Sequence, residues 1–220
     1  MKKKALLFSV LFVLICTQAF CEEKTDFLGP MTAKMKRGVI NTFTGWAEFP
    51  IQIWKGYDEG FRGNRKDKFR GILFGIVDGV SHSVGRTASG LSDMLGYWAA
   101  EPESDAGVGV SLDGEYAWEK GEPYDGFDPD FTQAVIRPSV NKLFRGSGNL
   151  IFGFMELPNQ ITKGIKDKAP DRGVLKGLWF WASREVSGIS DLLSAPFPNP
   201  HDNVGFKFDE EWPWEAFGEE

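Results

Sequence analysis

Cysteine and histidine are nearly absent from this sequence. Its 220 residues include two cysteines and two histidines, and both cysteines, Cys16 and Cys21, lie within the first 21 residues. The rest of the chain therefore offers no disulfide, thiol nucleophile or cysteine metal site. His82 and His201 follow no metal-ligand spacing, so we expect two exposed histidines, no metal and no other cofactor.

The chain also lacks an excess of basic residues and, beyond its start, any long apolar run. It has 25 Lys and Arg against 31 Asp and Glu, a formal net charge of −6, which predicts no nucleic-acid partner and no general attraction to anionic lipid. No later segment is apolar enough to predict a simple membrane-spanning helix. The motifs of serine hydrolases and of nucleotide-binding loops are absent, and we predict that the protein is not an enzyme.

The start of the chain has the layout of a signal peptide. Three lysines precede the apolar run 5–15, and small and polar residues follow. An N-terminal membrane anchor is the alternative, but the run is short for one. We expect residues 1–21 to direct export. Cleavage after Ala19 and after Cys21 both fit, and lipid attachment at Cys21 stays open although Phe20 suits a lipoprotein site poorly.

The remaining chain repeats itself. RGVINTFTGWAEFP at 37–50 returns as RGSGNLIFGFMELP at 145–158, and RTASGLSD at 86–93 returns as REVSGISD at 184–191. So many matches in the same order indicate an internal duplication. The predicted divisions are a first unit, a linker and a second unit: 34–120, 121–141 and 142–217.

The longest helical pattern covers 69–98. Its apolar residues recur every three or four positions and share one face: Phe69, Leu73, Ile76, Val77, Val80, Val84, Leu91, Leu95 and Trp98. A stripe of small residues runs beside that face: Gly71, Gly75, Gly79 and Ser83. Each glycine costs a helix roughly 1 kcal/mol against alanine. The stripe therefore predicts close approach of another helix or of a membrane surface.

Each unit predicts a helical hairpin. Pro50 and Pro158 lack an N–H, so the first helix should kink or restart there, with the proline in the first turn of the continuation. The second helix of unit two, 173–193, carries Gly173 and Gly177 at the stripe positions.

A short tail with alternating apolar residues ends each unit, at 108–112 and at 204–208. Alternation predicts a short strand, and the two strands could pair with each other. The predicted fold is mainly α: two repeated helical hairpins, each with a kinked first helix, a glycine-striped second helix and an extended tail. A single unit buries little apolar area, so we expect the units to pair.

Charged residues present in both units are the strongest site candidates: Arg37 and Arg145, Glu48 and Glu156, Lys55 and Lys163, Arg86 and Arg184, Asp93 and Asp191. Arg86 and Asp93 fall on one helical face, and Glu48 could meet Arg86 across the hairpin. The structural interpretation is an ion pair that sets the register of two helices. The functional alternative is a carboxylate pair for glycoside hydrolysis, which needs a cleft that this architecture does not predict.

The eight tryptophans form the remaining unusual feature: Trp46, Trp54, Trp98, Trp118, Trp179, Trp181, Trp212 and Trp214. They predict either packing within the hairpins or contact with a membrane interface.

The Arg-Gly-x-x-Asn-x-x-x-Gly pattern at 37–45, the following Glu-Phe-Pro, the Gly-spaced helix and the Pro-Phe-Pro ending at 196–198 resemble the exosortase system-associated protein family. Unit two keeps that ending, whereas unit one departs from it at 96–99. The resemblance implies a small exported protein of the Gram-negative cell envelope, linked to an exosortase or exopolysaccharide system. The family has no established activity.

These observations predict a non-enzymatic exported envelope protein, a binding or scaffolding module in the periplasm or at the outer membrane. Its partner would be an envelope protein, a glycan or a membrane surface, and a homo-oligomer stays open. One alternative is peripheral outer-membrane attachment through the amphipathic helices. Another is a glycan-acting enzyme that uses Glu48 and Glu156 or Asp93 and Asp191, which requires carboxylates open to a groove.

Overall fold

The computed structural model describes residues 28–61, 63–102, 112, 114–119, 136–199 and 205–215. These residues form two helical hairpins and two short strands, which confirms the predicted fold class. The predicted signal peptide and most of the predicted linker lie outside the described residues.

Hairpin one pairs a broken first helix with one long helix. Helix α2 (Leu28–Thr44), the 3-10 turn η1 (Gly45–Ala47) and helix α3 (Glu48–Glu59) run against α4 (Lys68–Leu95). Pro50 lies in the first turn of α3, as predicted, because that position needs no N–H for the helix.

Hairpin two repeats this arrangement. Helix α5 (Arg137–Phe152), the turn η3 (Gly153–Met155) and helix α6 (Glu156–Lys166) run against α7 (Pro170–Ser194), and Pro158 takes the place of Pro50. Helix α5 begins at Arg137, within the range 121–141 that was predicted as a linker. A proline in the first turn starts this helix early.

The glycine stripe brings the backbones of α3 and α4 together. A Cβ atom on Gly71 would lie 2.0 Å from the carbonyl oxygen of Gly56, and one on Gly75 would lie 2.4 Å from that of Gln52. Gly79 has a similar distance, 2.9 Å, to the Phe49 carbonyl. Only residues without a Cβ permit this approach, so the stripe serves helix packing.

The same packing recurs in hairpin two. A Cβ atom on Gly173 would lie 2.5 Å from the carbonyl oxygen of Gln160, and one on Gly177 would lie 3.0 Å from the Cα of Leu157. The predicted role of both glycines in close helix approach is confirmed.

The two hairpins join through short strands. Strand β1 (Ala100–Glu101), directly after α4, pairs in parallel with β2 (Phe206–Lys207). The sequence placed the strand of unit one at 108–112 instead, and of those residues only Leu112 is described, outside any strand. A buried cluster of Ala100, Trp179, Phe180 and Phe208 lies at this junction. Burial of these apolar groups stabilises a pairing that two-residue strands alone would not.

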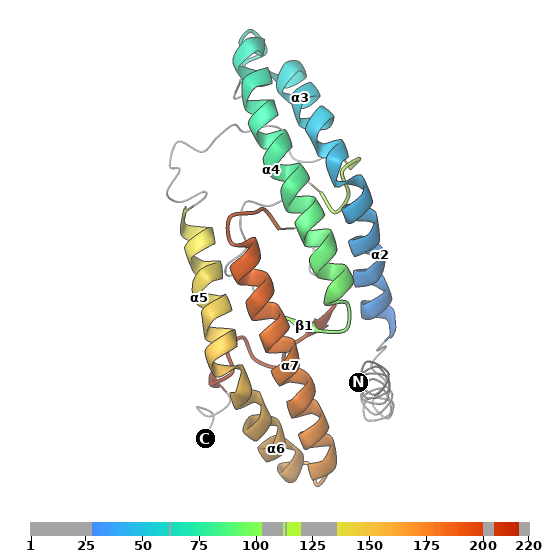
Figure 1. Ribbon diagram of the computed structural model, residues 1–220, viewed down its shortest axis with the longest axis vertical. Coiled ribbons are helices and arrows are strands. Elements are labelled where there is room, and N and C mark those ends of the chain that lie inside the picture. The colour runs from blue at the N-terminus through green and yellow to red at the C-terminus, as the bar shows by residue number, and fades with distance from the viewer. Residues whose placement is uncertain are drawn as a thin grey trace, which may run out of the picture.

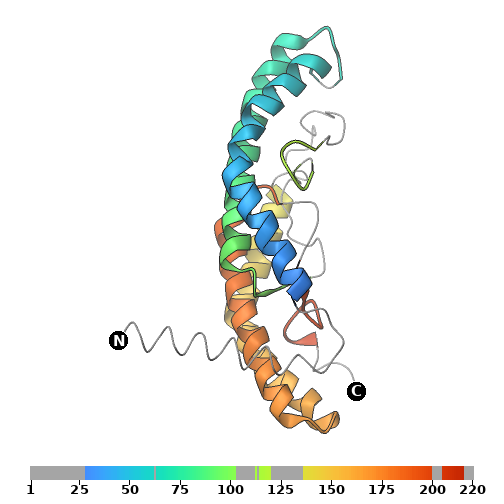
Figure 2. The ribbon, with the colours of Figure 1, turned by 90° about the vertical axis from the view of Figure 1, so that its right-hand side faces the viewer.

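The helices form one curved layer. Figure 1 shows α4 and α7 side by side in its middle, with α2 and α3 flanking α4 and with α5 and α6 flanking α7. The α3–α4 and α6–α7 tips point to opposite ends of the molecule (Figure 1). Figure 2 shows the strands and the described tail segments on the concave side of this layer.

Candidate functional site

A buried arginine links three elements of hairpin one. The Nε of Arg86 donates to Oε1 of Glu48 at 2.6 Å, and neither residue is more than 1% exposed. Its Nη1 donates to the carbonyl oxygen of Glu115 at 2.7 Å, and its Nη2 to that of Gly114 at 3.1 Å. The ion pair predicted from sequence is confirmed, and it also holds the tail on the concave side.

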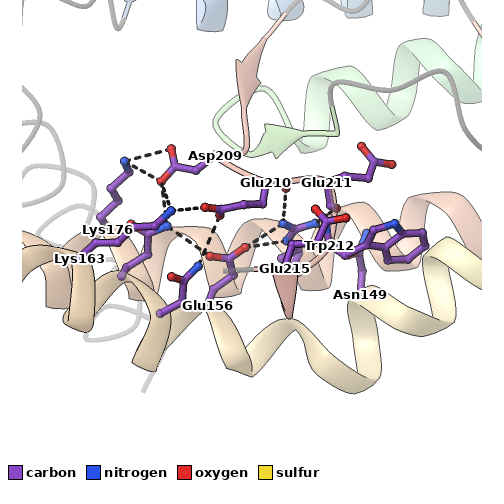
Figure 3. Close-up of polar contacts among 12 residues, drawn as sticks. Asn149, Glu156, Lys163, Lys176, Asp209, Glu210, Glu211, Trp212 and Glu215 are labelled. Atoms are coloured by element: carbon purple, nitrogen blue, oxygen red, sulfur yellow. Dashed lines mark hydrogen bonds and ion pairs between the residues drawn. The ribbon is translucent and has the colours of Figure 1, made fainter. Parts of the chain in front are cut away.

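Hairpin two builds the same arrangement (Figure 3). The Nη2 of Arg184 donates to Oε1 of Glu156 at 2.8 Å and to the carbonyl oxygen of Glu210 at 2.7 Å. Its Nη1 donates to the carbonyl of Glu211 at 2.6 Å. Lys163, another predicted candidate, forms an ion pair with the Glu210 side chain. Burial raises the pKa of Glu156, although the charge of Arg184 opposes the shift.

A second ion pair ties the first helix of each hairpin to its partner. Arg37 donates to both oxygens of Asp93, at 2.6 and 2.9 Å. Arg145 does the same to Asp191, at 2.6 and 2.7 Å. Asp93 thus lies on the same face of α4 as Arg86, as predicted, but pairs with α2. Burial raises the pKa of Asp93 against the opposing effect of Arg37.

The four repeated carboxylates are therefore all paired with arginines. None is the open carboxylate that the glycan-hydrolase alternative requires. Lys55, the other repeated candidate, is half-buried on α3.

Sequence reasoning missed the other repeated polar residues of this network: Lys34 and Lys142, Asn41 and Asn149, Gln52 and Gln160. All six are at most 4% exposed. The same alignment of the two units could have found them, because each pair stands at matching positions. Each pair has the same buried polar residue in both units, so this side of the hairpins has a polar interior rather than an apolar one.

Lys142 is buried at the C-terminal end of α7. Its Nζ donates to the carbonyl oxygens of Ser194 at 2.9 Å and Phe197 at 3.0 Å, and to Oδ1 of Asn199 at 2.7 Å. Burial lowers the pKa of Lys142 from 10.5 to about 8. Lys34, its counterpart, instead pairs with Glu101 at 2.8 Å.

This lowered pKa predicts a pH dependence of stability. The unfolded chain binds the Lys142 proton up to pH 10.5, whereas the folded chain begins to release it near pH 8. The free energy of unfolding should therefore rise between about pH 8 and 10.5, because the unfolded state binds more protons there. Urea unfolding of Lys142→Met should lack this rise. An equal slope in both proteins would contradict the assignment.

A small cavity of about 90 Å³ lies where the hairpins meet. Both Arg–Asp pairs, of Arg37 and of Arg145, line it, together with Ser92 and Ser190, whose Oγ atoms are 2.7 Å apart. The opposite charges are already paired, so the cavity presents no unbalanced charge to a ligand.

The prediction of exposed histidines is wrong for His82. It is 8% exposed, and its Nδ1 lies 3.1 Å from Nε2 of Gln52 and 4.0 Å from Oε2 of Glu48. His82 precedes Arg86 by one helical turn, so it shares the buried polar face. His201 lies outside the described residues. Among the residues described, no group of three or more acidic, histidine or cysteine side chains could hold a metal.

The face opposite the arginines is apolar and exposed. At about 100° per residue, Val77, Val84 and Leu91 lie across α4 from Arg86, and they are 56, 42 and 46% exposed. Other exposed apolar residues of hairpin one are Val39, Phe43, Trp46, Phe49, Trp54, Tyr57, Phe69, Leu73, Ile76, Val80 and Leu95. Because Arg86 binds the tail on the concave side, this apolar face forms the convex side (Figure 2).

Hairpin two continues the apolar face. Ile189 and Leu193, across α7 from Arg184, are 49 and 73% exposed, and Phe144 and Ile151 of α5 are 71 and 61% exposed. The tryptophans differ in exposure. Trp179 is buried within the fold, whereas Trp46, Trp54 and Trp118 are each at least 60% exposed, and Trp181 and Trp214 are 37 and 40% exposed.

No helix within the described ranges combines the length and hydropathy needed to cross a bilayer. Comparisons of the chain with protein-family models, with curated proteins and with solved structures find no match. The resemblance to the exosortase system-associated family stays a prediction.

Proposed function

We propose that this protein is a non-enzymatic, exported envelope protein that attaches peripherally to a membrane and acts there as a scaffold. The carrying observation is the convex apolar face, which runs over both hairpins and which no described segment covers. The signal-peptide layout and the family resemblance support an envelope setting.

The distribution of polar groups favours a bilayer as the environment of this face. The hairpins bury arginine, glutamate and asparagine side chains on one side and expose valine, leucine and phenylalanine on the other. Contiguous exposed apolar patches larger than a few hundred Å² are rare on soluble monomers. Amphipathic helices that lie in the membrane interface bury such a face to a depth of about 5–10 Å.

The aromatic residues support the same orientation. Trp46 and Trp54 are 70 and 68% exposed on the first helix of hairpin one, and Phe154 takes the matching place of Trp46 in hairpin two. Tryptophan is enriched at the boundary between headgroups and acyl chains because its ring is apolar with one polar N–H. The tails on the concave side would then face water and be free to contact other envelope components.

Serine substitutions on the convex face test this proposal. The triple variant Val77→Ser, Val84→Ser and Leu91→Ser should bind phosphatidylcholine vesicles about a hundredfold more weakly, because each half-buried aliphatic side chain contributes about 1 kcal/mol. The measurement is vesicle flotation over a range of lipid concentrations. The matched control is Trp118→Ser, which removes an exposed apolar side chain from the tail side and should leave binding unchanged.

Fractionation of the native host cell is the test in vivo. We expect retention in the envelope fraction through high-salt and carbonate washes, since apolar contact does not depend on charge screening. Two results would show that protein rather than lipid covers the convex face. One is recovery of the protein in the soluble fraction. The other is a stable dimer of the wild type together with a monomer of the triple serine variant.

A further inference from the structure

Basic and acidic residues are unevenly distributed along the chain, although its net charge is modest. Residues 28–100 and 136–199, which contain the helices, carry 19 Lys and Arg against 11 Asp and Glu. Residues 101–135 and 200–220, which contain the tails, carry 2 Lys and Arg against 17 Asp and Glu. The expectation from net charge, that anionic lipid is not attracted, therefore does not apply to the helical layer by itself.

Seven of the nine exposed basic residues described in the helical layer lie at the hairpin tips, and the other two are Lys36 and Arg137. The α3–α4 tip exposes Arg65, Lys66, Lys68 and Arg70, and the α6–α7 tip exposes Lys166, Lys168 and Arg172. Acidic residues also occur there, but basic ones outnumber them six to three over 55–70 and five to two over 163–176. Lys163 and Lys176 of the second range pair with Asp209 and Glu210 of the tail, which leaves three basic against two acidic residues at the α6–α7 tip. Both tips therefore carry net positive charge.

Along α4, the middle of the convex face is almost uncharged. Between residues 71 and 95, α4 holds three charged residues, Asp78, Arg86 and Asp93, and the last two are buried in ion pairs on the other side. The described acidic residues of the tails, such as Glu115 and Glu211, lie on the concave side.

The curvature of the layer matches this pattern. The convex middle would lie deepest in a bilayer, and both tips bend away from it towards the level of the headgroups (Figure 2). Trp54 and Tyr57, exposed beside the α3–α4 tip, suit that level. The Nζ of Lys68 lies 4.1 Å from the Tyr57 ring centroid, so apolar and cationic groups meet at the tip.

We infer that the two hairpin tips bind the headgroups of anionic phospholipids and so direct the protein to acidic membranes. This inference rests on the proposed membrane attachment and adds the lipid class. Each lysine or arginine near an anionic surface strengthens binding about fivefold. Positive charge at both tips would also hold the long axis of the curved helical layer parallel to the membrane plane.

Vesicles with and without phosphatidylglycerol test the inference. Addition of phosphatidylglycerol to phosphatidylcholine should strengthen binding at least tenfold, and high salt should abolish the gain but not the binding to phosphatidylcholine. The variant Lys66→Gln with Lys168→Gln removes one charge from each tip. It should lose about fivefold for each charge on the anionic vesicles and bind pure phosphatidylcholine like the wild type.

The matched control is Lys207→Gln, which removes an exposed lysine from β2 on the tail side and should leave the gain intact. A tip variant that keeps the full gain would overturn the inference. The proposed attachment would fail separately if the wild type did not bind phosphatidylcholine, or if the triple serine variant bound it equally well. All three substituted lysines are exposed, so each variant should fold like the wild type. Thermal unfolding of each variant checks this.

Discussion

Replacement of Arg86 by methionine should lower the free energy of unfolding by about 3–5 kcal/mol. The substitution leaves the Glu48 carboxylate, 1% exposed, without its cation. It also removes the donors for the tail carbonyls of Gly114 and Glu115. A buried charge that loses its partner keeps the full cost of its desolvation, which makes this the largest expected effect of a single substitution.

Urea unfolding followed by circular dichroism measures this effect. The control is Arg70→Met, because Arg70 is 67% exposed and its pair with Asp67 spans 3.5 Å, and exposed pairs contribute about 0–1 kcal/mol. The double variant Glu48→Gln with Arg86→Met should cost less than the sum of its parts, since it leaves no unpaired charge. A loss of under 1 kcal/mol for Arg86→Met would contradict the role of this pair.

Addition of one methyl group at Gly75 should also destabilise the protein, by about 2 kcal/mol or more. The new Cβ would lie 2.4 Å from the Gln52 carbonyl oxygen and 2.9 Å from the Ile53 Cα. Both are backbone atoms, so α3 must move away from α4. Alanine is the better helix former by roughly 1 kcal/mol, so any net loss reports the helix contact directly.

Comparison of Gly75→Ala with Val80→Ile separates this contact from a general effect of size. Val80 is 51% exposed on the convex face, and a methylene added there should change the free energy of unfolding by less than about 0.5 kcal/mol. Thermal unfolding is sufficient to rank the variants. A Gly75→Ala protein more stable than the wild type by about 1 kcal/mol, the full gain in helix propensity, would mean that the two helices do not touch at this position.

Much of the hairpin architecture follows from the sequence because the same sequence pattern occurs in both units. Pro50 and Pro158 mark the restart of each first helix, and the glycine stripe marks the helix contact. The pairing of Glu48 with Arg86 follows from repeated charges at helical spacing. These features are local, and the duplication supplies a second copy of each.

Periodicity could not reveal which face of the helices lies inside. An amphipathic pattern defines two faces, and the apolar one is normally buried. Here the tail carbonyls reach Arg86 and Arg184 from 28 and 27 residues further along the chain and cover the polar face. The strand predicted at 204–208 contains β2, but its partner β1 was predicted at 108–112 instead of 100–101, because a two-residue strand carries no pattern.

The orientation of the convex face on a membrane is the central claim, and an environment-sensitive fluorophore tests it most directly. A chain expressed from Glu22 onward contains no cysteine, so Leu91→Cys and Lys207→Cys each give a single labelling site. On addition of anionic vesicles, the label at position 91 should shift its emission to the blue and resist an aqueous quencher, while the label at 207 should not change. An unchanged label at 91, or equal changes at both positions, would contradict the proposed attachment.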